Sequence, residues 1–212
     1  MKRATVWLGL LMGLAAPLGA QYRHHKHFFT AGGGAGVPSG DLKRYLSDSP
    51  AFRFNYGYRF HRFFQVDTGL DVVFYAADVN DYYESQVGDL RIRDYQYFVP
   101  LGGRTILPLA GDRVLLSFGG GGAYVRYQES IRQPFGEYGP RVECPPCRSR
   151  SGWGYYGLIG GSVALDRRKM LRLGVTSQVY RAETSGDAFG GVPPVRTKDK
   201  WVNTMAELTV SF

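Results

Sequence analysis

The last stretch of the chain, Trp201 to Phe212 (WVNTMAELTVSF), decides the fold. Side chains of a β-strand point alternately to its two faces, so even-numbered and odd-numbered residues separate. Leu208, Val210 and Phe212 share an apolar face, whereas Glu207 falls on a more polar face. One face suits lipid and the other suits a polar interior, which predicts a strand that spans a membrane as part of a β-barrel.

Seven other segments have the length and composition of strands. In the clearest one (AFRFNYGYRF), an aromatic residue occupies every second position, a pattern that a helix would scatter around its axis. Pro100 lies inside the fourth segment, and a proline, which has no N–H to donate, is expected at a sheet edge or a bulge. The segments are His27–Pro38, Ala51–Phe60, Phe63–Tyr75, Arg93–Leu107, Arg113–Gln128, Gly152–Leu165 and Met170–Ala182.

The connections between these segments alternate between short turns and long polar loops. The turns cover residues 61–62, 108–112 and 166–169, and the loops cover 39–50, 76–92, 129–151 and 183–199. Membrane barrels have short periplasmic turns and long external loops, with both chain ends on the periplasmic side when the strand number is even. This rhythm predicts an all-β fold, an eight-stranded antiparallel up-and-down barrel with its four loops facing outward.

The first twenty residues have the layout of a cleavable secretory signal. Lys2 and Arg3 precede an apolar run from Val6 to Ala16, and a cleavage site follows at residues 18–20. We therefore expect a signal peptide at 1–20 and a barrel domain at 21–212. An N-terminal membrane anchor is the alternative, but the run is shorter than the roughly 20 residues of a spanning helix.

These features resemble the small eight-stranded outer-membrane proteins of the OmpA-like and OmpX-like barrel type. The likeness rests on Gly57–Asp71 (GYRFHRFFQVDTGLD), Tyr97–Leu109 (YFVPLGGRTILPL) and the final AELTVSF. It implies a bacterial outer-membrane location and insertion by the outer-membrane assembly machinery, for which Phe212 resembles the recognition signal. Nothing follows Phe212, so the peptidoglycan-binding domain of the two-domain OmpA type is not expected.

Seven charged residues fall on the predicted inward faces. The interior of an eight-stranded barrel is just wide enough for side chains, and a buried charge is costly unless it is paired. We therefore expect a salt-bridge network that plugs the barrel, with a gated polar path as the alternative. The residues are Arg53, Arg59, Asp67, Asp71, Arg104, Arg172 and Glu207.

Two cysteines, Cys144 and Cys147, lie in the third long loop. In an exported chain this pair favours a disulfide. A thioredoxin-like site needs a βαβ context, and a metal clip needs about two more Cys or His ligands, neither of which this loop provides. We predict a disulfide that stiffens the exposed tip of the loop, and no cofactor.

A basic segment rich in histidine, residues 23–27 (RHHKH), opens the mature chain. It contains the ligand type of a transition-metal site, but a chain terminus would hold a metal only weakly, and no resident metal is predicted. The ends of the strands with short turns, counted over 23–26, 59–62, 104–113 and 166–172, carry ten Lys or Arg against two Asp. This basic rim suits the phospholipid head groups of the inner leaflet of the outer membrane, although solvated turns would look the same.

Tyrosine and tryptophan gather toward the predicted outer ends of the strands. Aromatic girdles at the membrane interface account for most of them, although an adhesive or carbohydrate-binding surface uses the same residue types. The residues are Tyr82, Tyr83, Tyr95, Tyr97, Tyr124, Tyr127, Trp153, Tyr155, Tyr156, Tyr180 and Trp201.

An enzymatic role is not expected. A hydrolase or acyltransferase on such a barrel needs a nucleophile and a histidine base near the outer rim, whereas all four histidines fall at the end with short turns. Nucleic acid is not an expected partner of an exported chain that lacks a basic helix.

We expect the protein to be a monomeric barrel with a structural or surface-interaction role in adhesion or envelope integrity. Its loops would present the surface for an extracellular ligand that the sequence does not identify. A narrow porin-like diffusion channel for small polar solutes is the alternative. A secreted soluble barrel is disfavoured, because outward residues such as Phe52 and Phe54 would expose a large apolar band to water.

Overall fold

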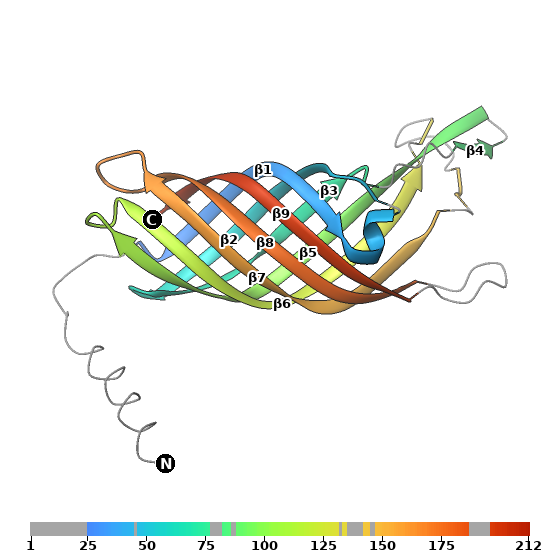
Figure 1. Ribbon diagram of the computed structural model, residues 1–212. Helices are drawn as coiled ribbons and strands as arrows, with labels where there is room; N and C mark the ends of the chain where they lie inside the picture. Colours follow the sequence, from blue (N-terminus) through green and yellow to red (C-terminus); the bar gives the residue numbers. More distant parts are fainter. Residues whose placement is uncertain are drawn as a thin grey trace, which may run out of the picture.

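The computed structural model shows a closed barrel of antiparallel strands (Figure 1). It describes residues 25–44, 46–76, 82–85, 88–131, 133–134, 142–144, 147–186 and 196–212, so the predicted signal peptide lies outside the described residues. The barrel strands are β1 (His27–Ser39), β2 (Ser49–His61), β3 (Phe64–Phe74), β5 (Gly88–Leu109), β6 (Val114–Ile131), β7 (Ser149–Ala164), β8 (Leu171–Gly186) and β9 (Arg196–Ser211).

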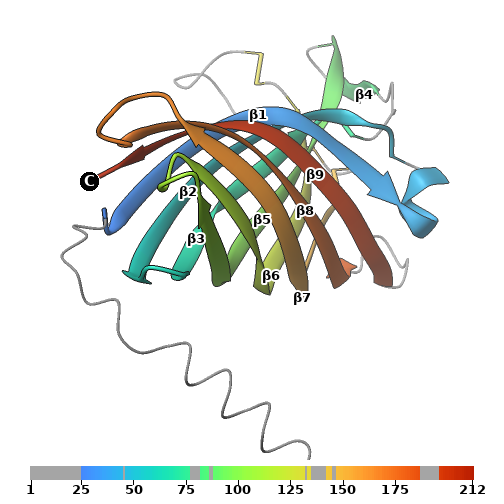
Figure 2. The ribbon, with the colours of Figure 1, turned by 60° about the vertical axis from the view of Figure 1, so that its left-hand side comes forward.

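Each barrel strand pairs with the barrel strands before and after it, and β9 returns to pair with β1. The ring also continues from β3 to β5, where Phe64 lies opposite Thr105 and Phe74 lies opposite Tyr95. Figure 2 shows the strands tilted around the wall, as the closure of an eight-stranded sheet requires. The prediction of an all-β, eight-stranded up-and-down barrel is confirmed.

Short turns join the strands at one end of the barrel, and long connections join them at the other. The turns lie between β2 and β3, β5 and β6, and β7 and β8. At the same end, the backbone N–H groups of Lys26 and His27 donate to the Phe212 carbonyl oxygen at 3.1 and 3.0 Å. In Figure 1 this turn end lies at the left and the loop end at the right. The predicted alternation of turns and loops is therefore confirmed.

The strands extend further toward the loop end than the sequence predicted. The fifth strand in the chain, β5, begins at Gly88 rather than Arg93, and a short strand β4 (Tyr82–Ser85) pairs with its first four residues. This hairpin occupies part of the stretch that was expected to be a loop. A short 3-10 helix, η1 (Gly40–Arg44), lies in the first long connection. None of the helices in the described part of the chain is long and apolar enough to cross a membrane.

Pro100 lies within the closed sheet, and the expectation of an edge or a bulge is wrong. Thr68 lies opposite Leu101 and Asp71 opposite Phe98, so β3 and β5 keep one register on both sides of the proline. No pairing joins the two positions between them. The ladder is interrupted where proline lacks a donor, without the extra residue that defines a bulge.

The two faces of the strands differ as predicted. Outward-facing side chains form a broad apolar surface on which Phe54 is 64% exposed and Leu101 is 62% exposed. The inward-facing Arg53 is 2% exposed, and many of its inward neighbours are also polar and buried. Such an exterior is expected of a barrel that faces lipid rather than water.

Candidate functional site

An ion-paired cluster centred on Arg53 lies in the barrel interior. Arg53 Nε and Nη2 donate to the two Asp71 carboxylate oxygens at 2.7 and 2.6 Å, and Nη1 donates to Glu207 Oε1 at 2.6 Å. All three side chains are buried. A forked guanidinium bonded to two carboxylates compensates a buried arginine well, because both charge and hydrogen-bond donors are satisfied.

Neutral side chains complete the bonding of the two carboxylates. The Tyr180 hydroxyl and Asn203 Nδ2 donate to Asp71 at 2.9 and 3.2 Å, and Thr176 Oγ1 donates to Glu207 at 2.8 Å. These donors come from β8 and β9, whereas Asp71 lies on β3, across the ring from β8. The cluster therefore ties opposite walls of the barrel together.

Strand register explains how Arg53 reaches Glu207. Gly32 on β1 lies opposite Arg53 on one side and opposite Glu207 on the other. The arginine side chain thus crosses a residue that has no side chain of its own. A Cβ at Gly32 would lie 2.9 Å from Glu207 Cγ and 2.8 Å from the carbonyl oxygen of Ala206, closer than real Cβ atoms come. Space for the ion pair requires glycine at this position.

A second cluster is centred on Asp67. Arg104 Nε and Gln65 Nε2 each donate to one of its carboxylate oxygens at 2.5 Å. Gly57 lies opposite Asp67 in the ladder, and a Cβ there would collide with the Gln65 amide. A missing side chain again makes room for a polar contact.

Two of the predicted inward arginines lie outside these paired clusters. The Arg59 guanidinium lies over the Phe28 ring, 4.3 Å from its centroid, and no carboxylate of the described residues forms an ion pair with it. Arg172 donates to the main-chain oxygens of Asp112 and Arg113 at the turn between β5 and β6. A ring and main-chain oxygens take the place of the carboxylates expected for these two residues.

A group of aromatic side chains packs against the Arg53 cluster. Phe98 stacks on Tyr180 with ring centroids 4.5 Å apart, contacts Trp201 edge-on at 5.8 Å, and Tyr156 lies 5.7 Å from Tyr180. All four rings are buried in the interior, and Tyr127 on β6 is buried too, so the assignment of Tyr127, Tyr156, Tyr180 and Trp201 to an interface girdle is wrong. Trp153, by contrast, is 74% exposed on the outside. The Arg53 cluster and these rings together fill this part of the barrel interior.

A further buried carboxylate, Asp199, lies in a stretch that was predicted to be a loop. Thr184 Oγ1 and Thr197 Oγ1 donate to it at 3.1 and 2.7 Å, and Arg150 Nη2 lies 3.6 Å away. Thr197 and Asp199 are odd-numbered residues of β9 and point inward, as Trp201 does. Extending the alternation four residues toward the loop end would have found this group.

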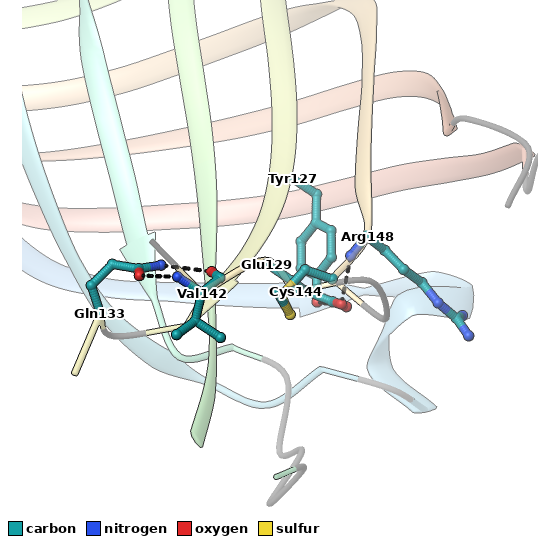
Figure 3. Close-up of a disulfide and its surroundings, with 7 residues drawn as sticks. Tyr127, Glu129, Gln133, Val142, Cys144 and Arg148 are labelled. Carbon is teal, nitrogen blue, oxygen red and sulfur yellow. Dashed lines mark hydrogen bonds between the residues drawn. A yellow bond between two sulfur atoms is a disulfide. The ribbon is translucent and has the colours of Figure 1, made fainter. Parts of the chain in front are cut away.

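Cys144 and Cys147 form a disulfide in the connection between β6 and β7 (Figure 3). The next residue, Arg148, donates its backbone N–H to Glu129 Oε2 at 2.8 Å, which fastens it to the end of β6. The disulfide therefore adjoins a residue that is held at the end of β6.

Side chains also fix the base of this loop (Figure 3). Gln133 Nε2 donates to the Val142 carbonyl oxygen at 3.0 Å, and the Val142 N–H donates to Gln133 Oε1 at 2.8 Å. The Tyr127 hydroxyl donates to Glu129 Oε1 at 2.9 Å. Both limbs of the loop are thus held close to the barrel independently of the disulfide.

The described histidines lie at the turn end. His27 Nδ1 lies 2.8 Å from the Tyr56 hydroxyl, His25 Nε2 lies 3.3 Å from a main-chain oxygen of the turn between β7 and β8, and His61 ends β2. No three metal-binding side chains come together anywhere in the described ranges. The histidine-rich segment begins outside those ranges, at residues 23 and 24.

The barrel resembles several solved structures. The chain is similar to Neisserial surface protein A, at 13% identity and TM-score 0.50, covering 88% of this chain and 97% of that one. It is similar to Ail, the attachment invasion locus protein of Yersinia pestis, at 13% identity and TM-score 0.51, covering 89% and 100%. The chain has the fold of a small eight-stranded outer-membrane β-barrel.

A third structure with this fold is the outer membrane protein OprG from Pseudomonas aeruginosa, at 14% identity and TM-score 0.52, covering 91% of this chain and 99% of that one. Ail has also been solved in complex with the heparin analogue sucrose octasulfate, and that structure is 12% identical with TM-score 0.51. No protein-family model and no curated protein sequence matches the chain. The chain shares with these proteins the closed eight-stranded barrel fold.

Proposed function

We propose that this chain is a surface-interaction protein of the outer membrane, with the barrel as a rigid support and the loop end as the binding surface. The observation that carries the proposal is the contrast between the two parts. The interior is closed by the Arg53 cluster and its aromatic neighbours, whereas the loop end carries the β4–β5 hairpin and a loop fastened at its base. A filled interior leaves no room for a solute, so interaction falls to the loops.

A polyanion is the ligand class that we favour for the loop end. Lys43, Arg91 and Arg148 are exposed there, and sulfate or carboxylate groups accept charge-assisted hydrogen bonds from such side chains. The complex of Ail with a heparin analogue makes heparin a suitable first probe.

Deletion of the loops one at a time tests this proposal. Each long connection is replaced by a short Gly-Ser link, and cells that express the variant are scored for adhesion, serum resistance and binding to heparin-coated surfaces. Arg167→Ala, at the turn end, is the matched control. We expect at least one loop deletion to abolish binding while the purified protein keeps its heat-modifiable migration in detergent. Unchanged adhesion and heparin binding in all four deletions would refute the proposal and leave a purely structural role.

A narrow diffusion pore remains the alternative function, and conductance separates the two. The almost complete burial of Arg53 and Trp201 in the interior supports a barrel that does not conduct. Planar-bilayer recordings of the wild-type protein should show no steady conductance. Reproducible open channels would favour the pore.

We further propose that residues 1–20 direct export and that Phe212 is read by the assembly machinery. The Phe212 ring is exposed and stacks on Phe29 and His27, with centroids 5.8 and 5.6 Å away. Phe212→Ala should therefore lower insertion in cells, while the variant refolded in detergent keeps its fold. Phe29→Ala, which removes the neighbouring exposed ring, should insert normally. Equal insertion of Phe212→Ala and wild type would contradict a signal role.

A further inference from the structure

A group of cations faces outward from the barrel wall near the loop end. Arg181 on β8 lies directly opposite Lys200 on β9, and Lys198 and Arg196 follow on the same face of β9. Glu183 lies opposite Lys198, yet within the described part of the chain no carboxylate comes within ion-pair distance of any of these four cations. Like charges opposite one another on neighbouring strands repel. An anion between them would remove that repulsion.

These cations lie where the apolar exterior ends. One outward position closer to the turn end, Val179 lies opposite Val202, and both belong to the apolar surface. Tyr155 on β7 lies opposite Arg181 and is 59% exposed. Exposed aromatic rings beside cations mark the depth at which a lipid bilayer changes from acyl chains to head groups. The cation pair is therefore at head-group level.

A strip of outward-facing glycines begins beside Tyr155. Gly157 is the next outward residue on β7, Gly120 lies opposite it on β6, and Gly103 lies opposite Gly120 on β5. A Cβ at Gly157 or Gly103 would meet no atom closer than 3.9 or 3.6 Å, so the packing of the wall does not demand glycine at these two positions. Three neighbouring strands nevertheless have no side chain in this row, which leaves a shallow groove on the outer wall.

The glycine strip slopes into the apolar band. Residues paired on neighbouring strands form rows perpendicular to the strands. Because the strands are tilted, such a row moves toward the turn end as it passes from β8 through β7 and β6 to β5 (Figure 1). It reaches a hollow of about 310 Å³ lined by Gly103 and the rings of Phe60, Phe64 and Phe118. At about 4.8 Å between strands, the strip from β7 to β5 is roughly 10 Å long, enough for much of an acyl chain.

We propose that this wall binds a lipid of the outer leaflet whose head group carries phosphate. The phosphate lies between Arg181 and Lys200 and neutralises them through charge-assisted hydrogen bonds. An acyl chain lies along Gly157, Gly120 and Gly103, in contact with backbone that side chains would otherwise cover. Diphosphorylated lipid A has this chemistry and is the probe. The assignment to the outer leaflet rests on the proposed function, in which the loop end faces outward. Binding of lipid A in detergent does not depend on that orientation.

Native mass spectrometry of the refolded protein in detergent with diphosphorylated lipid A tests the site. The double variant Arg181→Gln, Lys200→Gln should bind about tenfold more weakly or worse, the effect of losing a charge-assisted contact. Arg126→Gln is the matched control, because Arg126 also faces outward near the loop end but lies opposite Ser151. It should bind as the wild type does, and dephosphorylated lipid A should bind the wild type about as weakly as lipid A binds the double variant.

Two results would overturn the head-group site: equal retention of lipid A by the wild type and the double variant, or equal retention of phosphorylated and dephosphorylated lipid A by the wild type. Gly157→Leu fills the strip without touching the cations and should also weaken binding. Wild-type binding by Gly157→Leu would refute the acyl-chain path. Heat-modifiable migration verifies the fold of every variant, and adhesion of the same variants distinguishes this site from the loop function.

Discussion

Replacement of Arg53 by methionine would test whether paired charge holds the barrel interior together. The change removes three charge-assisted hydrogen bonds, two to Asp71 and one to Glu207. Both carboxylates would then stay buried with only neutral donors beside them. Removal of one partner from a buried ion pair typically costs about 3 to 5 kcal/mol, because the remaining charge is uncompensated. We expect the free energy of unfolding of Arg53→Met to fall by about that amount.

Urea unfolding in lipid vesicles, followed by the fluorescence of Trp153 and Trp201, measures this loss. Arg126→Met removes an arginine from the outer wall and should change the free energy of unfolding by less than about 0.5 kcal/mol. Arg53→Met combined with Asp71→Asn and Glu207→Gln should recover most of the stability, because no unpaired charge remains. A triple variant as unstable as the single one, or a single-variant loss below about 1 kcal/mol, would refute the reasoning.

Gly32→Ala should destabilise the barrel by about 1 to 3 kcal/mol through crowding of the inward ladder, whereas Gly33→Ala, whose Cβ has its nearest neighbour at 3.6 Å, should be nearly neutral; equal urea midpoints would contradict this. Replacement of Cys144 and Cys147 by serine should leave the unfolding midpoint unchanged and speed protease cleavage of the loop, and a large midpoint drop would show that the loop base depends on the disulfide. Main-chain N–H groups at the start of β8 lower the pKa of Asp166, so its carboxylate stabilises the fold above the unfolded-state pKa and ceases to do so as pH falls through the lowered folded-state pKa. Asp166→Asn should be less stable than wild type at neutral pH, with a difference that disappears in acid; a gap that persists in acid would exclude this cause.

The barrel could be predicted from the sequence because the alternation of side chains runs through almost every strand. Over ten residues of β2, the aromatic side chains lie on one face and Arg53 lies on the other. Only a β-strand separates alternate residues in this way. Strand β4 was not predicted, because its residues, YYES, do not alternate between apolar and polar. Its pairing with β5 depends on main-chain hydrogen bonds that any sequence can make.

The inward orientation of the ionisable residues was readable from the sequence, but their partners were not. Arg53 reaches Glu207 only because Gly32 lies opposite both, and that juxtaposition depends on the stagger of β1, β2 and β9 around the closed ring. Arg59 finds the Phe28 ring on β1 for the same reason. Asp199 was missed because the last strand was taken to begin at Trp201.

The sequence separations within the Arg53 cluster bear on the order in which the protein folds. Arg53 and Asp71 are 18 residues apart on adjoining strands of one hairpin, whereas Arg53 and Glu207 are 154 residues apart. Contacts distant in sequence form late, because closing the intervening chain costs entropy. The hairpin can thus carry its half of the cluster early, while Glu207 waits for β9 to meet β1. The same event removes the last open edges of the sheet. We expect final closure to be cooperative, since a nearly closed intermediate would hold an unpaired carboxylate and two unpaired strands at once.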